Sequence, residues 1–262
     1  MTNRLEGLLC VLFRLSQGST YSQMAPIFDL SPVCLSRIFN GTVTRIWEKI
    51  GDPLRSLDVH PLLTDRVCLE AYSEAIEAKT GVGLDAVGFI DCNITDIARP
   101  SVGQQISYSG KSMFYLALYN FNIYCYGTVL LSGKTHAVKH GLIMIPTGIG
   151  FVFGPSVGRS HDARMVVEHD VNAQLRNTIG PEYCIYGDAG FKQSDKIVTP
   201  HRQGNPQQMM FNRQMRKGRI SIEHWFGTMQ TTFPFLNSKH RLQILASSCG
   251  VSTIWCVSAH LM

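Results

Sequence analysis

The sequence lacks paired cysteines and a signal-peptide pattern, and these absences limit the classes of protein to which the chain can belong. Eight cysteines occur in the 262 residues, and none of them forms a Cys-x-x-Cys pair. The start of the chain shows no signal-peptide pattern, because Arg4 and Glu6 precede only a short apolar segment that charged residues interrupt. We therefore expect an intracellular protein whose thiols are reduced and mostly buried.

Charged residues are also few, at 16% of the chain, whereas 45% of the residues are hydrophobic. This composition is typical of a folded globular protein, and the length allows one or two domains with a large core. The formal net charge of +5 permits nucleic-acid binding without proving it. Six basic or histidine side chains lie close together late in the chain: His201, Arg202, Arg213, Arg216, Lys217 and Arg219.

One segment, residues 112–133, has no charged residue and is rich in Phe and Tyr. It is long enough for a membrane span, but Asn120, Asn122 and several tyrosines lie in its middle, and no second span accompanies it. The tetrapeptides Tyr-Ser-Gly-Lys at 108–111 and Leu-Ser-Gly-Lys at 131–134 flank it. We interpret the segment as an insertion, such as a retained intron, and expect no membrane partner.

The first 80 residues are predicted to be helical. Apolar residues at helical spacing indicate a helix over residues 5–17, which Gly18 ends. Thr20, preceded by a serine, is a suitable cap for a second helix over residues 21–28. The sequence at 51–53, Gly-Asp-Pro, predicts a break before further helical sequence.

A turn at residues 29–32 leads into a third helix, with Pro32 near its first position. Two short helices joined by such a turn fit a helix-turn-helix DNA-binding motif, with Arg37 on the second helix. An ordinary helical hairpin is an equally good interpretation. We expect a helical, DNA-binding region over residues 1–80, a boundary near residues 79–83, and a second domain over residues 84–262.

Strands and helices alternate in the second domain. The predicted strands are residues 86–91, 136–145, 149–153, the apolar run from 183, and 196–199; the predicted helices are 161–177, 207–229 and a last one from about 241. Three strands followed by helix, strand, helix, strand and helix is the order of a ribonuclease-H-like domain. The fold class is therefore predicted to be α/β.

Three acidic residues have positions typical of a metal site. Asp91 and Asp188 each end an apolar strand, where side chains reach the crevice that binds ligands. Glu223 lies on the predicted helix, and 34 residues separate it from Asp188. Mg²⁺ and Mn²⁺ prefer carboxylate oxygens, and a pair of such ions promotes phosphodiester cleavage. A single Asp at such a position is more often a turn former or a helix cap. The set of three therefore carries the hypothesis of a divalent-metal site.

Six motifs follow one another over about residues 84–240: 88–92 (Gly-Phe-Ile-Asp-Cys), 99–100 (Arg-Pro), 108–111, 153–162 (ending in His-Asp), 187–191 (Gly-Asp-Ala-Gly-Phe) and 211–227. Together they resemble the PIF/Harbinger-type DDE transposases and the Harbinger transposase-derived nuclease. The resemblance implies a ribonuclease-H-like fold, a metal-dependent DNA endonuclease and a nuclear protein. It assigns Asp91, Asp188 and Glu223 as catalytic carboxylates. It makes Asp162 a further metal ligand or, equally well, a helix cap.

The partners expected from this resemblance are DNA, further copies of the chain and a separate DNA-binding protein. The residues expected to contact DNA are Arg37, Arg213, Arg216, Lys217 and Arg219, although a solvated basic face is the alternative. The insertion favours another class, a DNA-binding or scaffold protein that kept the fold but lost catalysis.

Other side chains have simpler interpretations. His136 and His140 are spaced for zinc on a helix, but the surrounding sequence predicts a strand, so structural roles are favoured. Arg219 and Glu223 share a helix face and can form an intrahelical pair. Trp225 and Phe226 are expected in the core.

Overall fold

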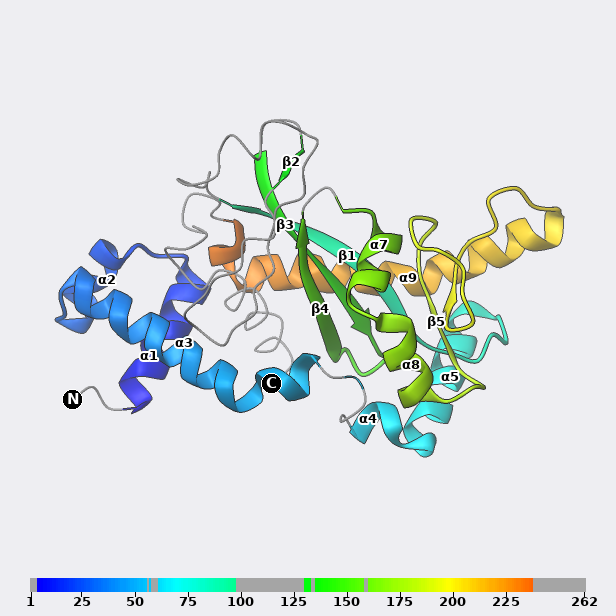
Figure 1. Ribbon diagram of the computed structural model, residues 1–262, viewed down its shortest axis with the longest axis horizontal. Coiled ribbons are helices and arrows are strands. Elements are labelled where there is room, and N and C mark those ends of the chain that lie inside the picture. Colours follow the sequence, from blue (N-terminus) through cyan, green and yellow to red (C-terminus); the bar gives the residue numbers. More distant parts are fainter. Residues whose placement is uncertain are drawn as a thin grey trace.

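The computed structural model describes residues 4–55, 57, 61–97, 130–132, 135–157 and 160–237. Within these residues, helices cover a mixed β-sheet, so the predicted α/β class is confirmed (Figure 1). The predicted last helix from residue 241, the motifs at 99–100 and 108–111, and residues 112–129 of the suspected insertion lie outside the described part. No helix in the described part is long and apolar enough to cross a membrane.

The N-terminal region contains three helices, α1 (Arg4–Gln17), α2 (Tyr21–Phe28) and α3 (Pro32–Arg55). Thr20 caps α2 in a capping box with Gln23, as the sequence predicts. The predicted break at residues 51–53 is wrong, because α3 continues to Arg55. Proline removes only one backbone donor, and so close to a helix end that loss affects little of the helix. The helix-turn-helix function of α2 and α3 stays a prediction.

Two helices lead from this region into the sheet, α4 (Pro61–Thr64) and α5 (Arg66–Thr80). The Asp65 carboxylate accepts a hydrogen bond from the Val67 amide at 3.0 Å and so starts α5. Gly81, with a φ of 73°, ends it in the left-handed conformation that glycine adopts without strain. The end of α5 coincides with the predicted boundary at residues 79–83.

Six strands form one sheet within the described residues: β1 (Ala86–Ile97), β2 (Leu130–Ser132), β3 (Thr135–Met144), β4 (Gly150–Val157), β5 (Cys184–Tyr186) and β6 (Ile197–Val198). Their order is β2-β3-β1-β5-β6, and β4 also pairs with β3. β1 is antiparallel to β3 and parallel to β5, which is parallel to β6. The last residues of the suspected insertion therefore take part in the sheet, since β2 pairs with β3.

β1 is longer than predicted. The sequence predicts an end at Asp91, but the strand continues to Ile97, because β3 pairs with it over its whole second half. The parallel partner β5 stops earlier, and its last register pair joins Phe89 to Tyr186. Asp91 therefore lies inside a strand, at the point where one of its two neighbouring strands ends.

The remaining helices are α7 (Asp162–Glu168), α8 (Val171–Ile179), α9 (Pro206–Thr232) and the short 3₁₀ turn η2 (Pro234–Asn237). A single helix was predicted over residues 161–177. The chain instead breaks at Asp170, whose φ of 50° is left-handed and incompatible with a continuous helix. The segment between β5 and β6, where the ribonuclease-H-like order expects a helix, consists of turns.

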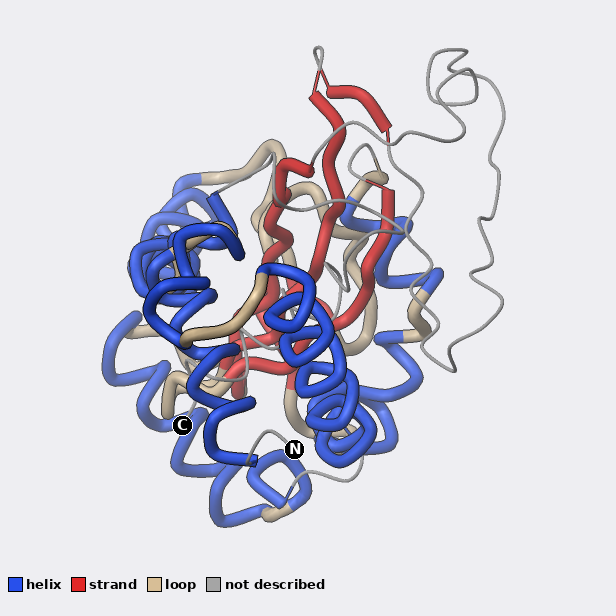
Figure 2. The backbone as a smooth tube through the Cα atoms, turned by 90° about the vertical axis from the view of Figure 1, so that its left-hand side faces the viewer, coloured by secondary structure: helices blue, strands red, loops and turns tan. Residues whose placement is uncertain are grey.

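Alternate residues of the central strands face opposite sides of the sheet, and helices lie on both sides (Figure 2). One face carries Phe89, Leu142 and Met144 and packs against α9. The other carries Ile90 and Ile143 and packs against α7 and α8. The strand ends thus lie between two covered faces, and α9 runs across one of them.

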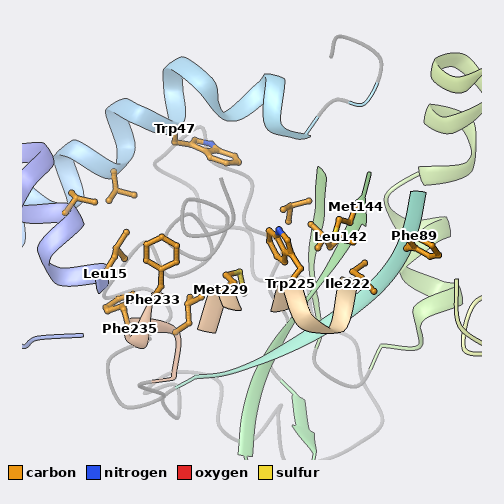
Figure 3. Close-up of a cluster of buried hydrophobic side chains, with 14 of the residues drawn as sticks. Leu15, Trp47, Phe89, Leu142, Met144, Ile222, Trp225, Met229, Phe233 and Phe235 are labelled. Atoms are coloured by element: carbon orange, nitrogen blue, oxygen red, sulfur yellow. The ribbon is translucent and has the colours of Figure 1, made fainter. Parts of the chain in front are cut away.

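The first hydrophobic cluster extends into the N-terminal helices (Figure 3). Leu15 on α1 and Trp47 on α3 belong to the same cluster as Met229 on α9 and Phe235 on η2. Arg14 is buried there, with its guanidinium carbon 3.6 Å from the ring centre of Tyr21 and 5.3 Å from that of Phe235. The two regions therefore share a core, while their division into two domains stays a prediction.

Candidate functional site

Two of the three predicted carboxylates are brought together by the sheet register. Phe89 on β1 and Tyr186 on the parallel strand β5 are partners, and Asp91 and Asp188 each follow two residues later. Side chains two residues apart point to the same face of a strand, and parallel neighbours end at the same edge. The charge of Asp188 accordingly contributes to raising the pKa of Asp91.

Asp162 joins this pair from the start of α7. A β-carbon placed on Gly190 would lie 2.7 Å from Asp162 Oδ2 and 3.0 Å from Asp188 Oδ1, so both carboxylates lie over this glycine. The Gly190 amide also donates a hydrogen bond to Asp188 Oδ1 at 2.8 Å. Asp188 therefore acts as a turn former, which is the alternative interpretation of an Asp at such a position. Its carboxylate nevertheless faces that of Asp162.

Lys139 on β3 forms an ion pair with Asp162 and donates a hydrogen bond to the carbonyl of Ser160 at 3.0 Å. The lysine side chain is 11% exposed and the aspartate side chain 20% exposed, so the pair is largely buried. The N-cap residue of α7 is His161, and it makes no side-chain cap bond. Asp162 is instead the first residue of α7, where a carboxylate is favourable at the positive end of the helix, and it also pairs with Lys139.

Glu223 connects to the site through Arg219, one turn earlier on α9. Arg219 Nη2 lies 2.6 Å from Glu223 Oε1, which confirms the predicted intrahelical pair. Its other terminal nitrogen, Nη1, lies 3.3 Å from Asp91 Oδ2. One guanidinium thus joins the first and third predicted carboxylates, and Arg219 is 128 positions from Asp91 in the sequence.

Burial raises the pKa of Asp91, and the neighbouring charges of Asp188 and Asp162 act in the same direction. The hydrogen bond from the Cys92 amide and the charge of Arg219 oppose this rise. Burial also raises the pKa of Tyr186, which lies beneath the strand ends, to about 12. The site is an acidic cluster in which carboxylates repel one another and two basic side chains, Lys139 and Arg219, compensate them.

The donor chemistry fits a hard divalent cation, because four carboxylates lie within electrostatic reach and a cradle over Gly190 brings two of them together. In the described part of the chain, however, no three His, Cys, Asp or Glu side chains are close enough to hold one ion. Arg219 separates Glu223 from Asp91, and Lys139 holds Asp162. A metal site here requires at least one of these basic side chains to give way.

Four of the five residues predicted to contact DNA lie away from the carboxylates. Arg213, Arg216 and Lys217 are exposed on the first half of α9, which extends past the sheet (Figure 1). Arg37 is exposed on α3, and the N-terminal helices lie at the opposite end of the molecule (Figure 1). Arg219 alone among the five also contacts the carboxylates.

The sequence analysis missed Lys139 and Gly190. Lys139 lies four residues before Ile143 on β3 and so on the same face of the strand, which α7 covers, and there it meets Asp162 at the start of that helix. The sequence pattern around Lys139 does not show that α7 begins beside it. Gly190 could have been recognised, because a second glycine directly after an Asp-Ala pair often allows close approach of other groups.

The predicted histidine pair lies on β3, which confirms the strand. His140 is buried, and neither ring nitrogen has a hydrogen-bond partner. Burial lowers its pKa to about 4, and the nearby His169 acts in the same direction. His140 is therefore a neutral core residue. The predicted core position of Trp225 is also confirmed, and its indole donates to the Gly148 carbonyl at 3.1 Å.

A comparison with protein families matches residues 90–258 to a family described as the DDE superfamily endonucleases. The match includes Asp91, Asp162, Asp188 and Glu223. No curated protein and no solved structure shows a significant similarity to the chain.

Proposed function

The chain belongs to the DDE superfamily endonucleases, and on that premise we propose that it is a divalent-metal-dependent DNA endonuclease of the PIF/Harbinger transposase type. The proposal includes a ribonuclease-H-like catalytic domain, a nuclear location and hydrolysis of phosphodiester bonds. Family membership supports the nuclease class, and the six sequence motifs support the Harbinger type. The order β4-β3-β1-β5-β6, with the long helix α9 packed on one face of the sheet, supports the fold.

The observation that carries the proposal is the shared register of Asp91 and Asp188, two residues beyond the last pair of β1 and β5. Asp162 lies against Asp188 across Gly190, and Glu223 connects to Asp91 through Arg219. Residues from two strands and two helices, far apart in the sequence, thus converge at one edge of the sheet. Turn formation alone does not explain this convergence.

In the proposed mechanism, Asp91, Asp188 and Glu223 hold Mg²⁺ or Mn²⁺, with Asp162 as a further ligand. When bound, such ions supply a nucleophilic hydroxide and stabilise charge at phosphorus and on the leaving oxygen. Lys139 fixes Asp162 and limits repulsion among the carboxylates. The ring of Tyr186 is buried close enough to Asp188 and Arg219 for their charges to act on its pKa.

DNA binding is proposed for two exposed surfaces. Arg213, Arg216 and Lys217 on α9 would contact phosphates, which fix the position of the duplex without reading its sequence. Arg37 on α3 would contribute from the helix-turn-helix. A homo-oligomer and a separate DNA-binding partner protein are further proposals.

A second candidate is a DNA-binding or scaffold protein without catalysis. It is favoured by the basic side chains that occupy the carboxylates, because Lys139 and Arg219 already neutralise two of the four. The two candidates differ in one respect that an experiment can measure, namely metal-dependent nicking.

The test is nicking of supercoiled plasmid by the full chain in Mg²⁺ or Mn²⁺, with a chelator as control. The substitution Asp188→Asn keeps the shape but removes charge that a hard cation needs, so the nicking rate should fall by roughly 100-fold or more. Asp195→Asn is the matched control, because Asp195 is an exposed carboxylate of the same segment between β5 and β6 and is paired with Arg176. If the parent binds DNA and metal but never nicks, the scaffold function takes precedence.

A further inference from the structure

Arg219 is built into the carboxylate site. It lies one residue after the buried Gly218, on the side of α9 that packs against the sheet, and its side chain is 23% exposed. Its two terminal nitrogens contact different carboxylates, Asp91 at 3.3 Å and Glu223 at 2.6 Å. The neighbouring cations Arg216 and Lys217 point to solvent instead. The position of Arg219 therefore relates to the carboxylates and is not part of a general basic face.

The contact neutralises charge that would otherwise be costly. Asp91 is 18% exposed on its side chain, and its pKa is raised by burial and by two neighbouring aspartates. A guanidinium keeps its positive charge at all physiological pH values and matches carboxylate oxygens in its geometry. Arg219 thus supplies, from within the chain, the counter-charge that Asp91 and Glu223 require.

We propose that Arg219 is the resident counter-ion of Asp91 and Glu223 and competes with a divalent cation for these two carboxylates. The inference rests on the proposed function, because it assumes that the carboxylates bind metal. It adds that metal affinity is set by a side chain that is not itself a ligand. The chain binds metal only to the extent that the cation displaces this guanidinium.

Of the two basic side chains in the site, Arg219 is the one suited to displacement. Lys139 is more deeply buried and also donates to the Ser160 carbonyl, so its release would leave a buried ammonium and a buried carbonyl without partners. The contact between Arg219 and Asp91 is longer than the 2.7–2.9 Å of a strong charge-assisted bond. Glu223, its other partner, is 49% exposed, so solvent can replace that contact.

The test measures Mn²⁺ binding to the full chain by the electron paramagnetic resonance signal of free Mn²⁺, for the parent and for Arg219→Met. Methionine fills similar space without charge. Removing the competing cation should tighten Mn²⁺ binding roughly tenfold. Lys217→Met removes one charge from the exposed side of the same helix, and its Mn²⁺ affinity should stay within about twofold of the parent.

Arg219→Lys is the second variant. A lysine ammonium cannot span both carboxylates, so Mn²⁺ affinity should lie between those of the parent and Arg219→Met. This variant keeps the positive charge and decides the question if Arg219→Met fails to fold. Equal or weaker Mn²⁺ binding in the folded Arg219 variants, with a parent that binds Mn²⁺ and nicks DNA, overturns this inference and leaves the proposed function intact. If neither parent nor variants bind Mn²⁺, the metal-dependent function falls together with the inference.

Discussion

Asp162 and Asp188 face each other across Gly190, whose missing side chain leaves the space that their carboxylates occupy. A methyl group there would lie within 3.0 Å of an oxygen of each. Two carboxylates held this close in a half-buried site repel each other unless a cation compensates them. The proximity of the two carboxylates therefore favours the binding of a cation, and by itself it does not stabilise the fold.

The first prediction concerns this glycine. Gly190→Ala should force the two carboxylates apart and weaken Mn²⁺ binding at least about tenfold, while overpacking costs only about 1–3 kcal/mol of stability. Gly227→Ala is the matched control, because a β-carbon there meets nothing within 4 Å and an alanine favours the helix. Calorimetric titration with Mn²⁺ measures the effect, and unchanged affinity in Gly190→Ala would rule out a joint role of Asp162 and Asp188.

The second prediction concerns the buried pair of Lys139 and Asp162. Lys139→Met leaves the carboxylate without its partner and should lower the free energy of unfolding by about 3–5 kcal/mol. The double variant with Asp162→Asn should be more stable than Lys139→Met alone, because the uncompensated charge is gone. Urea unfolding of the parent, both single variants and the double variant gives the coupling. Additive effects would show that the pair contributes nothing as a pair.

The third prediction is a pH dependence. Because burial lowers the pKa of His140 to about 4 from an ordinary 6.5, the unfolded chain binds a proton in this interval that the folded chain does not. The free energy of unfolding should therefore fall as the pH is lowered from about 6.5 to 4, by up to about 3 kcal/mol from this residue. His140→Gln should remove most of this slope, whereas the exposed His224→Gln should keep it. A slope that persists in His140→Gln assigns it to other groups.

The fourth prediction concerns DNA binding by the N-terminal helices. In the full chain, Arg37→Ala should weaken duplex binding and lower the slope of log K against log salt by about one. Arg4→Ala, on the exposed part of α1, removes the same charge from another helix and should leave the slope unchanged. Fluorescence anisotropy over a series of salt concentrations measures both. Identical slopes for all three proteins would exclude Arg37 from the interface.

The local signals in the sequence predicted much of the fold. Thr20 starts α2, Pro32 starts α3, and the apolar spacing after residue 206 gives α9, because capping and periodicity depend on nearby residues only. The break between α7 and α8 was not predictable in this way. Asp170 takes a left-handed conformation that tertiary packing selects and that its neighbours in sequence do not require.

The sequence indicates the acidic residues of the candidate site and the pair of Arg219 with Glu223, but neither Lys139 nor the contact of Arg219 with Asp91. Strand ends and family motifs identify Asp91 and Asp188, since their positions follow from the strand pattern. The contact of Lys139 with Asp162 depends on where α7 begins against β3, and the contact of Arg219 with Asp91 depends on how α9 crosses the sheet. Both are consequences of packing between elements distant in sequence, and a single sequence carries no direct signal of them.

Arg14 lies among aromatic rings contributed by α2, α3 and η2, so its environment is assembled from both ends of the described chain. Replacing α2 and α3 with helices of another sequence would remove two of these three rings and leave Phe235 as the remaining one. A redesign of these helices should therefore keep aromatic side chains at both ring positions, so that the buried guanidinium retains its cation–π contacts.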